Sequence, residues 1–179
     1  MPRALALLVL VCSLPAAAYE VDLGTDAGQI GLGVRADASW IDDAYSTGFG
    51  GQIQLVMSPH WAVEGFLDAR RMTLTEGVRW DGHAGGSVSW RPFEWRLRPH
   101  VTVGACGDLV SVADTSDVKV ALLAGLGAAA DVGPVELSLE LRYMVHFGNE
   151  RDVGIADRLG TESHVAVVLA VTGWAFDLW

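Results

Sequence analysis

Three histidines, His83, His100 and His146, have the clearest potential for chemistry in this sequence. Each stands in a stretch where polar and apolar residues alternate, and a period of two indicates a β-strand whose successive side chains point to opposite faces. All three fall on the polar face of their strand. Imidazole binds transition metals, but no single strand carries two histidines at ligand spacing. We therefore predict a hydrogen-bonded polar network, with no metal, no cofactor and no catalytic residue.

The tetrapeptide His146-Phe147-Gly148-Asn149 is similar to the His-x-Ser-Asn motif of the outer-membrane lipid A deacylases, which are eight-stranded barrels. The resemblance implies ester hydrolysis by a serine that the histidine activates, with a glutamate that orients the imidazole. His146 and Asn149 match the motif, whereas Gly148 stands at the nucleophile position and has no hydroxyl group. A lipid A deacylase-like barrel is therefore an alternative to a non-enzymatic protein.

These residues lie on predicted strands in which polar and apolar residues alternate, and the clearest such strand lies within 134–148. Its odd positions are apolar, while its even positions carry carboxylates, a guanidinium and an imidazole. Comparable alternation predicts eight strands, at 29–40, 48–57, 61–71, 78–91, 95–105, 118–131, 135–148 and 164–179. Longer loops at 41–47, 73–77, 107–117 and 149–163 alternate with tight turns at 58–60, 92–94 and 133–134. This pattern is typical of an up-and-down barrel with both chain ends in the periplasm.

One face of these strands is apolar and the other is charged. If the apolar faces point outward, the lumen holds charged groups that nearly balance in sign, as a dry polar interior requires. The predicted lumen residues are Glu64, Asp68, Arg70, Arg79, Asp81, His83, Arg96, Arg98, His100, Glu136, Glu140, Arg142 and His146. If the apolar faces pointed inward instead, the chain would be a soluble periplasmic lipocalin-like barrel that binds a ligand.

Aromatic residues near the ends of the predicted strands favour the membrane arrangement, because such residues gather where lipid meets water. The predicted interface aromatics are Trp40, Trp61, Trp80, Trp90, Trp95, Phe147 and Trp179. In the last strand the apolar positions change parity near Thr172-Gly173. This change indicates either a β-bulge or a strand end that turns inward.

The N-terminus has the composition of a secretory signal peptide. Arg3 precedes the apolar residues 4–14, and small residues at 16–18 form a cleavage site before Tyr19. We predict a cleaved signal peptide at 1–18 and a single barrel domain at 19–179. The formal net charge of −10 argues against a nucleic-acid partner, because few basic groups are left to neutralise phosphates.

Residues 20–179 resemble the small eight-stranded outer-membrane barrels of the OmpA/OmpX kind in their pattern of strands and turns. The resemblance implies an all-β, eight-stranded antiparallel up-and-down transmembrane β-barrel in the outer membrane of a Gram-negative bacterium. A last strand that ends in Trp179 resembles the C-terminal signal that the barrel assembly machinery recognises. Arg70-Arg71 either binds phosphates of lipopolysaccharide or divides between a lumen ion pair and the lipid interface. We predict a non-enzymatic barrel with a plugged polar lumen, for membrane integrity or loop-mediated binding.

Overall fold

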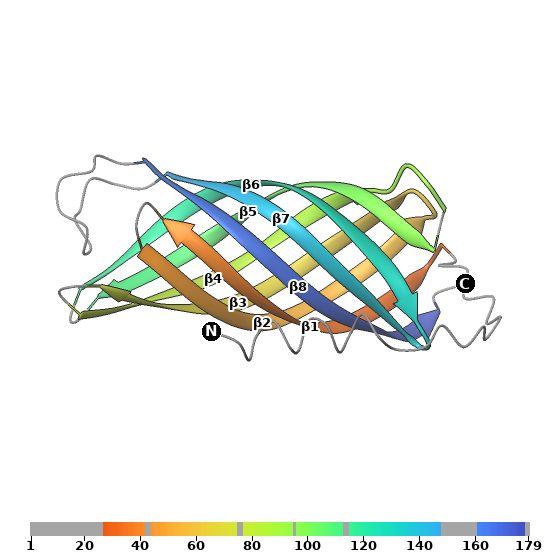
Figure 1. Cartoon of the computed structure of the whole chain (residues 1–179), viewed down its shortest axis with the longest axis horizontal. Coiled ribbons are helices and arrows are strands. Elements are labelled where there is room, and N and C mark those ends of the chain that lie inside the picture. Colours follow the sequence, from red (N-terminus) through yellow and green to blue (C-terminus); the bar gives the residue numbers. More distant parts are fainter. Residues whose placement is uncertain are drawn as a thin grey trace, which may run out of the picture.

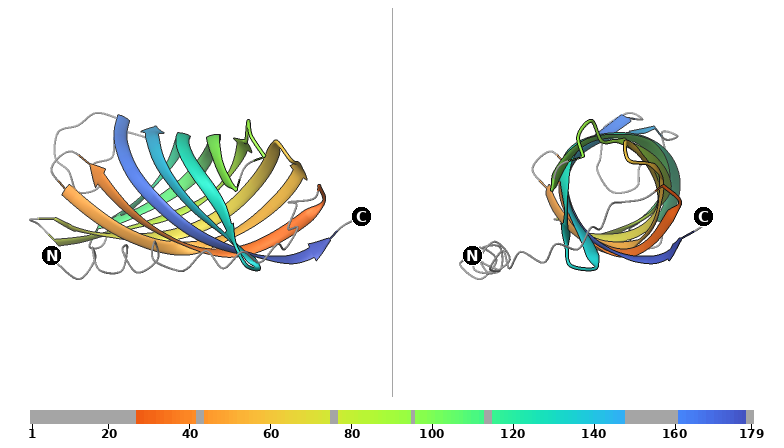
Figure 2. Two further views of the ribbon diagram at one scale, coloured as in Figure 1. Left: turned by 45° about the vertical axis from the view of Figure 1, so that its right-hand side comes forward. Right: turned by 90° about the vertical axis from the view of Figure 1, so that its right-hand side faces the viewer.

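Eight strands follow one another in the chain and close into a barrel. The computed structural model describes residues 27–41, 44–74, 77–94, 96–112, 115–147 and 161–177. The strands are β1 (Gln29–Ile41), β2 (Ala44–Ser58), β3 (Trp61–Leu74), β4 (Gly77–Trp90), β5 (Leu97–Val112), β6 (Thr115–Val132), β7 (Val135–Phe147) and β8 (Thr161–Asp177). Each strand pairs antiparallel with the next, and β8 pairs with β1 (Figure 1, Figure 2). Among the described residues, no helix is long and apolar enough to cross a membrane.

Alternation along each strand separates an apolar outer surface from a polar interior. In β7, Glu136, Glu140 and His146 are buried inside the barrel, whereas Leu139 and Leu141 are exposed outside it. The other strands show the same division, because residues two apart point to the same face of the pleat. A soluble barrel with an apolar interior has the opposite burial. The lipocalin-like alternative therefore does not fit this structure.

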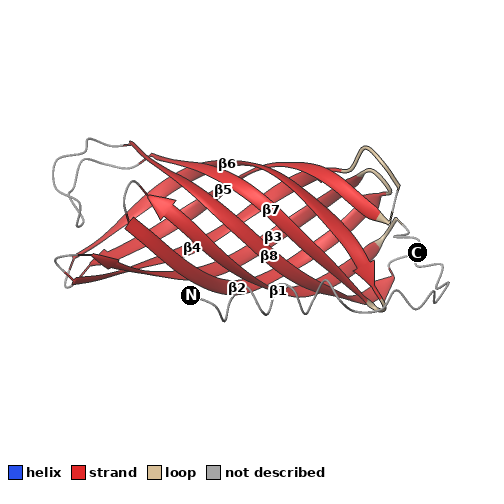
Figure 3. Ribbon diagram, in the orientation of Figure 1, coloured by secondary structure: helices blue, strands red, loops and turns tan. Residues whose placement is uncertain are grey.

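Strands occupy most of the segments that were predicted to be longer loops, as the ribbon in Figure 3 shows. Only residues 42–43, 75–76 and 113–114 separate β1 from β2, β3 from β4, and β5 from β6. The predictions of longer loops at 41–47, 73–77 and 107–117 are therefore wrong. Small and acidic residues such as Asp108 suggested a solvated loop, but the pleat points this carboxylate into the barrel. The fourth predicted loop, 149–163, overlaps the start of β8, and its other residues lie outside the described ones.

The last strand carries an irregularity near the position where its apolar parity changes. The pairing of β8 with β1 shifts by one residue at Ala175, which forms a β-bulge close to Thr172-Gly173. Just before the bulge, Trp174 lies against the inner side of β1. A Cβ atom on Gly31 would stand only 2.9 Å from the indole ring. The end of β8 therefore brings a bulky ring to the inner wall of the barrel.

Glycines on the inner face make room for the charged side chains. In β2, a Cβ atom on Gly50 would overlap the backbone carbonyl of Leu67 and the carboxylate of Asp68 on β3. In β6, a Cβ atom on Gly125 would overlap the carboxylate of Glu140 on β7. A narrow interior can hold these long side chains only where the neighbouring strand has no side chain of its own.

Candidate functional site in the barrel interior

Buried charged side chains form three clusters inside the barrel. We call the end with the connections 59–60, 91–96 and 133–134 the turn end, and the end where 148–160 join β7 to β8 the loop end. The turn-end cluster contains Gln54, Arg91, Arg98, Asp131 and Glu136. The central cluster contains Arg35, Asp37, Glu64, Phe66, Asp68, Arg70, His100, Glu140 and Arg142. The histidine cluster contains His83, Asp108, His146 and His164, with Arg79, Asp81, Lys119 and Glu162 beside them.

The turn-end cluster is centred on Glu136 of β7. Arg91, which follows β4, donates to both carboxylate oxygens, with Nη1 3.0 Å from Oε2 and Nη2 3.1 Å from Oε1. Arg98 of β5 donates to Oε2 of Glu136 at 2.9 Å and to the carboxylate of Asp131 at 2.5 and 2.7 Å. Two guanidinium groups thus share two carboxylates. Charge-assisted hydrogen bonds of this kind are among the strongest in proteins, so they fasten β4, β5, β6 and β7 together at this end.

The central cluster pairs guanidinium groups with carboxylates across the barrel. Arg35 of β1 reaches β3, where its Nη1 lies 2.8 Å from Oε1 of Glu64 and its Nε lies 3.1 Å from Oδ1 of Asp68. In β7, Nε of Arg142 donates to Oε1 of Glu140 at 2.6 Å. Each buried charge therefore has an opposite charge beside it, which offsets the cost of removing it from water.

An aromatic ring lies among these charges. The guanidinium carbons of Arg35 and Arg142 stand 4.5 and 5.3 Å from the ring centroid of Phe66, within cation–π range. Nearby, Nε of Arg70 lies 2.6 Å from Oδ2 of Asp37, so this arginine belongs to the interior. The centre of the lumen is therefore filled by side chains that hold one another in place.

The histidine cluster lies toward the loop end, where β4, β5 and β7 contribute one side chain each. Nε2 of His83 is 2.9 Å from Oδ1 of Asp108, and Nε2 of His146 is 2.9 Å from Oδ2 of the same carboxylate. His164 of β8 adds another imidazole, whose ring centroid lies 4.2 Å from that of His146. In the described part of the chain, the ligand atoms of His83, Asp108 and His146 all lie within 4.8 Å of one another. These three residues could hold a metal ion.

Ion pairs border the histidine cluster on its loop side. Glu162, near the start of β8, accepts hydrogen bonds from Nη1 of Arg79 at 2.9 Å and from Nζ of Lys119 at 2.9 Å. Arg79 also donates through Nε to Oδ1 of Asp81 at 2.7 Å. One carboxylate thus links β4, β6 and β8 between the cluster and the loop end.

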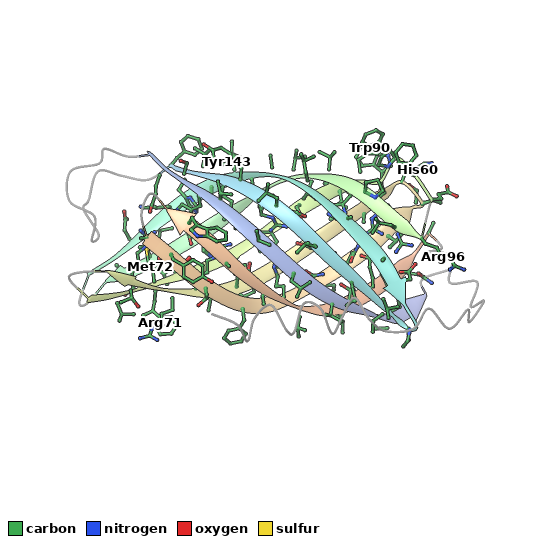
Figure 4. The ribbon with its side chains drawn as sticks, in the orientation of Figure 1. His60, Arg71, Met72, Trp90, Arg96 and Tyr143 are labelled. Carbon is green, nitrogen blue, oxygen red and sulfur yellow. The ribbon has the colours of Figure 1, made fainter. Side chains whose placement is uncertain are left out.

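The structure places the predicted lumen residues inside the barrel, with one exception. Arg96 is exposed and precedes β5, which begins one residue later, so its prediction is wrong (Figure 4). Alternation does not extend back to a residue outside the strand. His100 does not join the other two histidines, because its Nε2 lies 3.4 Å from Oε2 of Glu140. Gly148 and Asn149 of the deacylase-like tetrapeptide lie outside the described residues.

Several interior residues were not among those predicted. They are Arg35, Asp37, Arg91, Asp108, Glu162 and His164. The sequence feature that could have predicted Asp108 is its even position, because it continues the inward-facing series of His100 and Thr102 along β5. His164 has the same kind of signal, since the exposed apolar residues Val165 and Leu169 occupy odd positions and His164 an even one. Ending the predicted fifth strand at residue 105 left out Asp108, whereas His164 was the first residue of the predicted last strand and was not assigned to a face.

Aromatic side chains stand on the outer surface near both ends of the barrel. Trp40, Trp80 and Phe147 are exposed near the loop end, and Trp61 and Trp90 are exposed near the turn end. Figure 4 shows Tyr143 and Trp90 on the outside near opposite ends. Trp95 and Trp179 lie outside the described residues. Of the two adjacent arginines, Arg70 points inward, while Arg71 is exposed with its guanidinium 6.0 Å from the ring centroid of Trp80.

No protein-family model matches the sequence, and no curated protein matches it significantly. Among solved structures, the chain is similar to Neisserial surface protein A, with a TM-score of 0.52, 13% identity, and coverage of 82% of this chain and 97% of that one. It also matches the N-terminal barrel domain of Pseudomonas aeruginosa OprF, with a TM-score of 0.49, 13% identity, and coverage of 79% and 96%. The attachment invasion locus protein Ail of Yersinia pestis matches with a TM-score of 0.46, 15% identity, and coverage of 84% and 99%.

The fold places the chain in a structural class. It is a closed eight-stranded antiparallel up-and-down β-barrel whose fold is similar to that of transmembrane barrels, so the predicted fold and the predicted resemblance in fold to small outer-membrane barrels are confirmed. At the identity found here, the similarity concerns the fold alone. Activity, partners and location must be argued from the side chains of this chain.

Proposed function

We propose that this chain is an integral outer-membrane protein without enzymatic activity. Its apolar outer surface anchors it in the membrane, and the charged side chains in its lumen prevent bulk flow of solutes. The observation that supports this most directly is the division of burial. Apolar side chains are exposed outside the barrel, while oppositely charged side chains are paired inside it. Its role is to support membrane integrity or to bind a partner at the loop end.

The outer surface supports the membrane location. Large apolar side chains such as Val34, Leu67 and Leu126 are about two-thirds exposed, at 66%, 65% and 65%. A continuous surface of this kind is unfavourable in water but suits contact with lipid tails. The aromatic side chains near both ends fit interfacial girdles. At the loop end, the exposed guanidinium of Arg71 beside Trp80 is suited to a phosphate of lipopolysaccharide.

The interior supports a closed lumen. With about eight strands, a barrel is just wide enough for its own side chains to fill the interior. Buried apolar and small side chains also pack in the interior, among them Leu123, Met144 and Phe66 of the central cluster. An ion that crossed this region would have to separate buried ion pairs and pass apolar side chains.

The position of His146 argues against a lipid ester hydrolase. Its side chain is fully buried in the interior and faces Asp108, so a lipid in the surrounding bilayer cannot reach its imidazole. The residue at the nucleophile position of the similar motif is Gly148, which has no hydroxyl group. Both observations favour a non-enzymatic barrel. Assembly in the outer membrane would use the last strand, β8, together with Trp179, which follows it in the sequence.

Two measurements test the proposal. Cell fractionation with gel migration before and after boiling should find the protein in the outer membrane, in a form that needs detergent and changes mobility when boiled. Conductance of the folded barrel in planar bilayers should show no ion channel. Recovery as a soluble periplasmic protein without a mobility shift would refute the membrane location, and a steady open conductance would refute the closed lumen.

A further inference from the structure

The pairing of strands brings His83, Asp108 and His146 together from three different strands. His83 of β4 stands directly opposite Asp108 of β5 in the antiparallel register. His146 belongs to β7, so β6 lies between it and Asp108. At this level β6 presents Ala121, the register partner of His146, and its small side chain lets the carboxylate and the imidazole meet across it.

Asp108 has no arginine or lysine as a partner, whereas each of the other buried carboxylates in the described residues has an arginine. The buried carboxylates in the described residues are paired as Asp37 with Arg70, Asp68 with Arg35, Asp81 with Arg79, Glu136 with Arg91 and Glu140 with Arg142. Asp108 contacts two imidazoles instead, although its side chain is 0% exposed. Lys119 stands opposite Asp108 in the register, but its Nζ donates to Glu162. A buried carboxylate without a cation is unfavourable, so this position calls for positive charge.

The contacts between these three residues are close but are not arranged as hydrogen bonds. Each Nε2 atom lies 2.9 Å from a carboxylate oxygen. Nevertheless, within the described residues, both Nε2 atoms and both oxygens of Asp108 lack a partner with hydrogen-bond geometry. The polar atoms of three strands thus converge on one point, as the ligand atoms of a bound ion do.

We propose that His83, Asp108 and His146 bind one divalent transition-metal ion of the zinc type inside the barrel. Two imidazole nitrogens and one carboxylate oxygen form a ligand set that zinc and its neighbours in the first transition row prefer. Ligand atoms on one tetrahedral ion with bonds of about 2.1 Å are roughly 3.4 Å apart, so small side-chain movements bring these atoms to that separation. His164, which packs against His146, supplies another imidazole beside the set.

The ion would join three strands of the barrel and neutralise Asp108. The site needs only the barrel fold, and it does not depend on whether the lumen conducts. Calcium and magnesium fit less well, because they prefer sites made of oxygen atoms. The buried position suits a structural ion, since ion pairs of Glu162 lie between the site and the loop end.

The test uses the full mature chain folded in detergent, stripped with a chelator and dialysed against Zn²⁺ or Co²⁺ alone. We expect about one Zn²⁺ per barrel and visible Co²⁺ absorption bands of a nitrogen and oxygen site. His83→Gln, His146→Gln and Asp108→Asn should each weaken Zn²⁺ binding by roughly a hundredfold, because loss of an outer partner alone costs about ten- to a hundredfold. His100→Gln is the matched control, since this buried histidine belongs to the central cluster.

Gel mobility before and after boiling shows which variants fold, and only folded ones are compared. If none of the three variants folds, the effect of Zn²⁺ on the thermal stability of the wild-type barrel tests the proposal. Zn²⁺ must then raise the temperature at which the folded band is lost, since an ion that binds only the folded state stabilises it. The proposal is overturned if the wild type binds no Zn²⁺, because the three residues are then a polar network only. It is also overturned if the variants bind as well as the wild type, or if His60→Gln at the exposed turn abolishes binding.

Discussion

Replacing Glu136 with glutamine removes one negative charge from the turn-end cluster while keeping the shape of the side chain. Glu136 is 2% exposed and accepts three hydrogen bonds from two arginines, at 2.9, 3.0 and 3.1 Å. In Glu136→Gln, Arg98 keeps the carboxylate of Asp131, but Arg91 keeps no carboxylate. Removing one partner of a buried ion pair costs about 3–5 kcal/mol. Because the amide oxygen can still accept one bond, we expect about 3 kcal/mol, or roughly a hundredfold in the unfolding equilibrium.

Urea unfolding of the folded barrel in detergent measures this free energy. The control is Glu94→Gln, whose side chain is 64% exposed and lies 3.7 Å from His60, so its loss should change stability by about 1 kcal/mol or less. The double variant Arg91→Met with Glu136→Gln should be more stable than Glu136→Gln alone, because it leaves no guanidinium without a carboxylate. If Glu136→Gln costs no more than Glu94→Gln, or if the two single losses add in the double variant, the pairing argument is wrong.

Three further predictions concern the inner wall, the outer wall and the closed lumen. Gly50→Ala should lower the folded fraction on gels, because the new Cβ would overlap the carbonyl of Leu67, whereas Gly51→Ala has 3.7 Å to the nearest atom and should fold normally. Leu67→Arg places a charge on the outer surface and should cost about 2–4 kcal/mol in urea unfolding from lipid vesicles, while a result near zero would contradict a lipid-facing position. Arg142→Ala removes a cation from the central cluster, so we expect cation-selective current in planar bilayers where the wild type is silent. Arg71→Ala, on the outside, should show no current. If neither variant shows a current, Arg142 does not help to close the lumen.

The strands were predictable where apolar residues mark every second position. In β7 the alternation of Leu139 and Leu141 with charged neighbours gives the strand and its outer face directly. The ends of β5 and β6 were not predictable by the same rule. Residues 107–117 contain glycine, serine, threonine and three aspartates, which in a soluble protein favour a loop. In this barrel the same composition continues the strand, because the interior supplies partners for polar side chains.

The sequence predicts which of these side chains point into the barrel, but not at which level along the barrel axis each one lies. Parity shows that His83, His100 and His146 point inward, yet it cannot show which of them lie at the same level. Their level depends on the register between strands, which sets His83 opposite Asp108 and leaves His100 beside Glu140. A shift of two residues in one pairing would keep every side chain on its face and still exchange the partners.

Charge balance is informative at the level of each cluster rather than for the whole lumen. The predicted interior nearly balanced in sign as a total, and that total could not distinguish a paired carboxylate from an unpaired one. In the structure, five buried carboxylates have an arginine within 3.1 Å, and these pairs explain how the barrel tolerates them. Asp108 has imidazoles in place of arginine. Asp108 is therefore the one buried carboxylate of the described residues that faces two histidines and no arginine, and it is the charge that the proposed ion would offset.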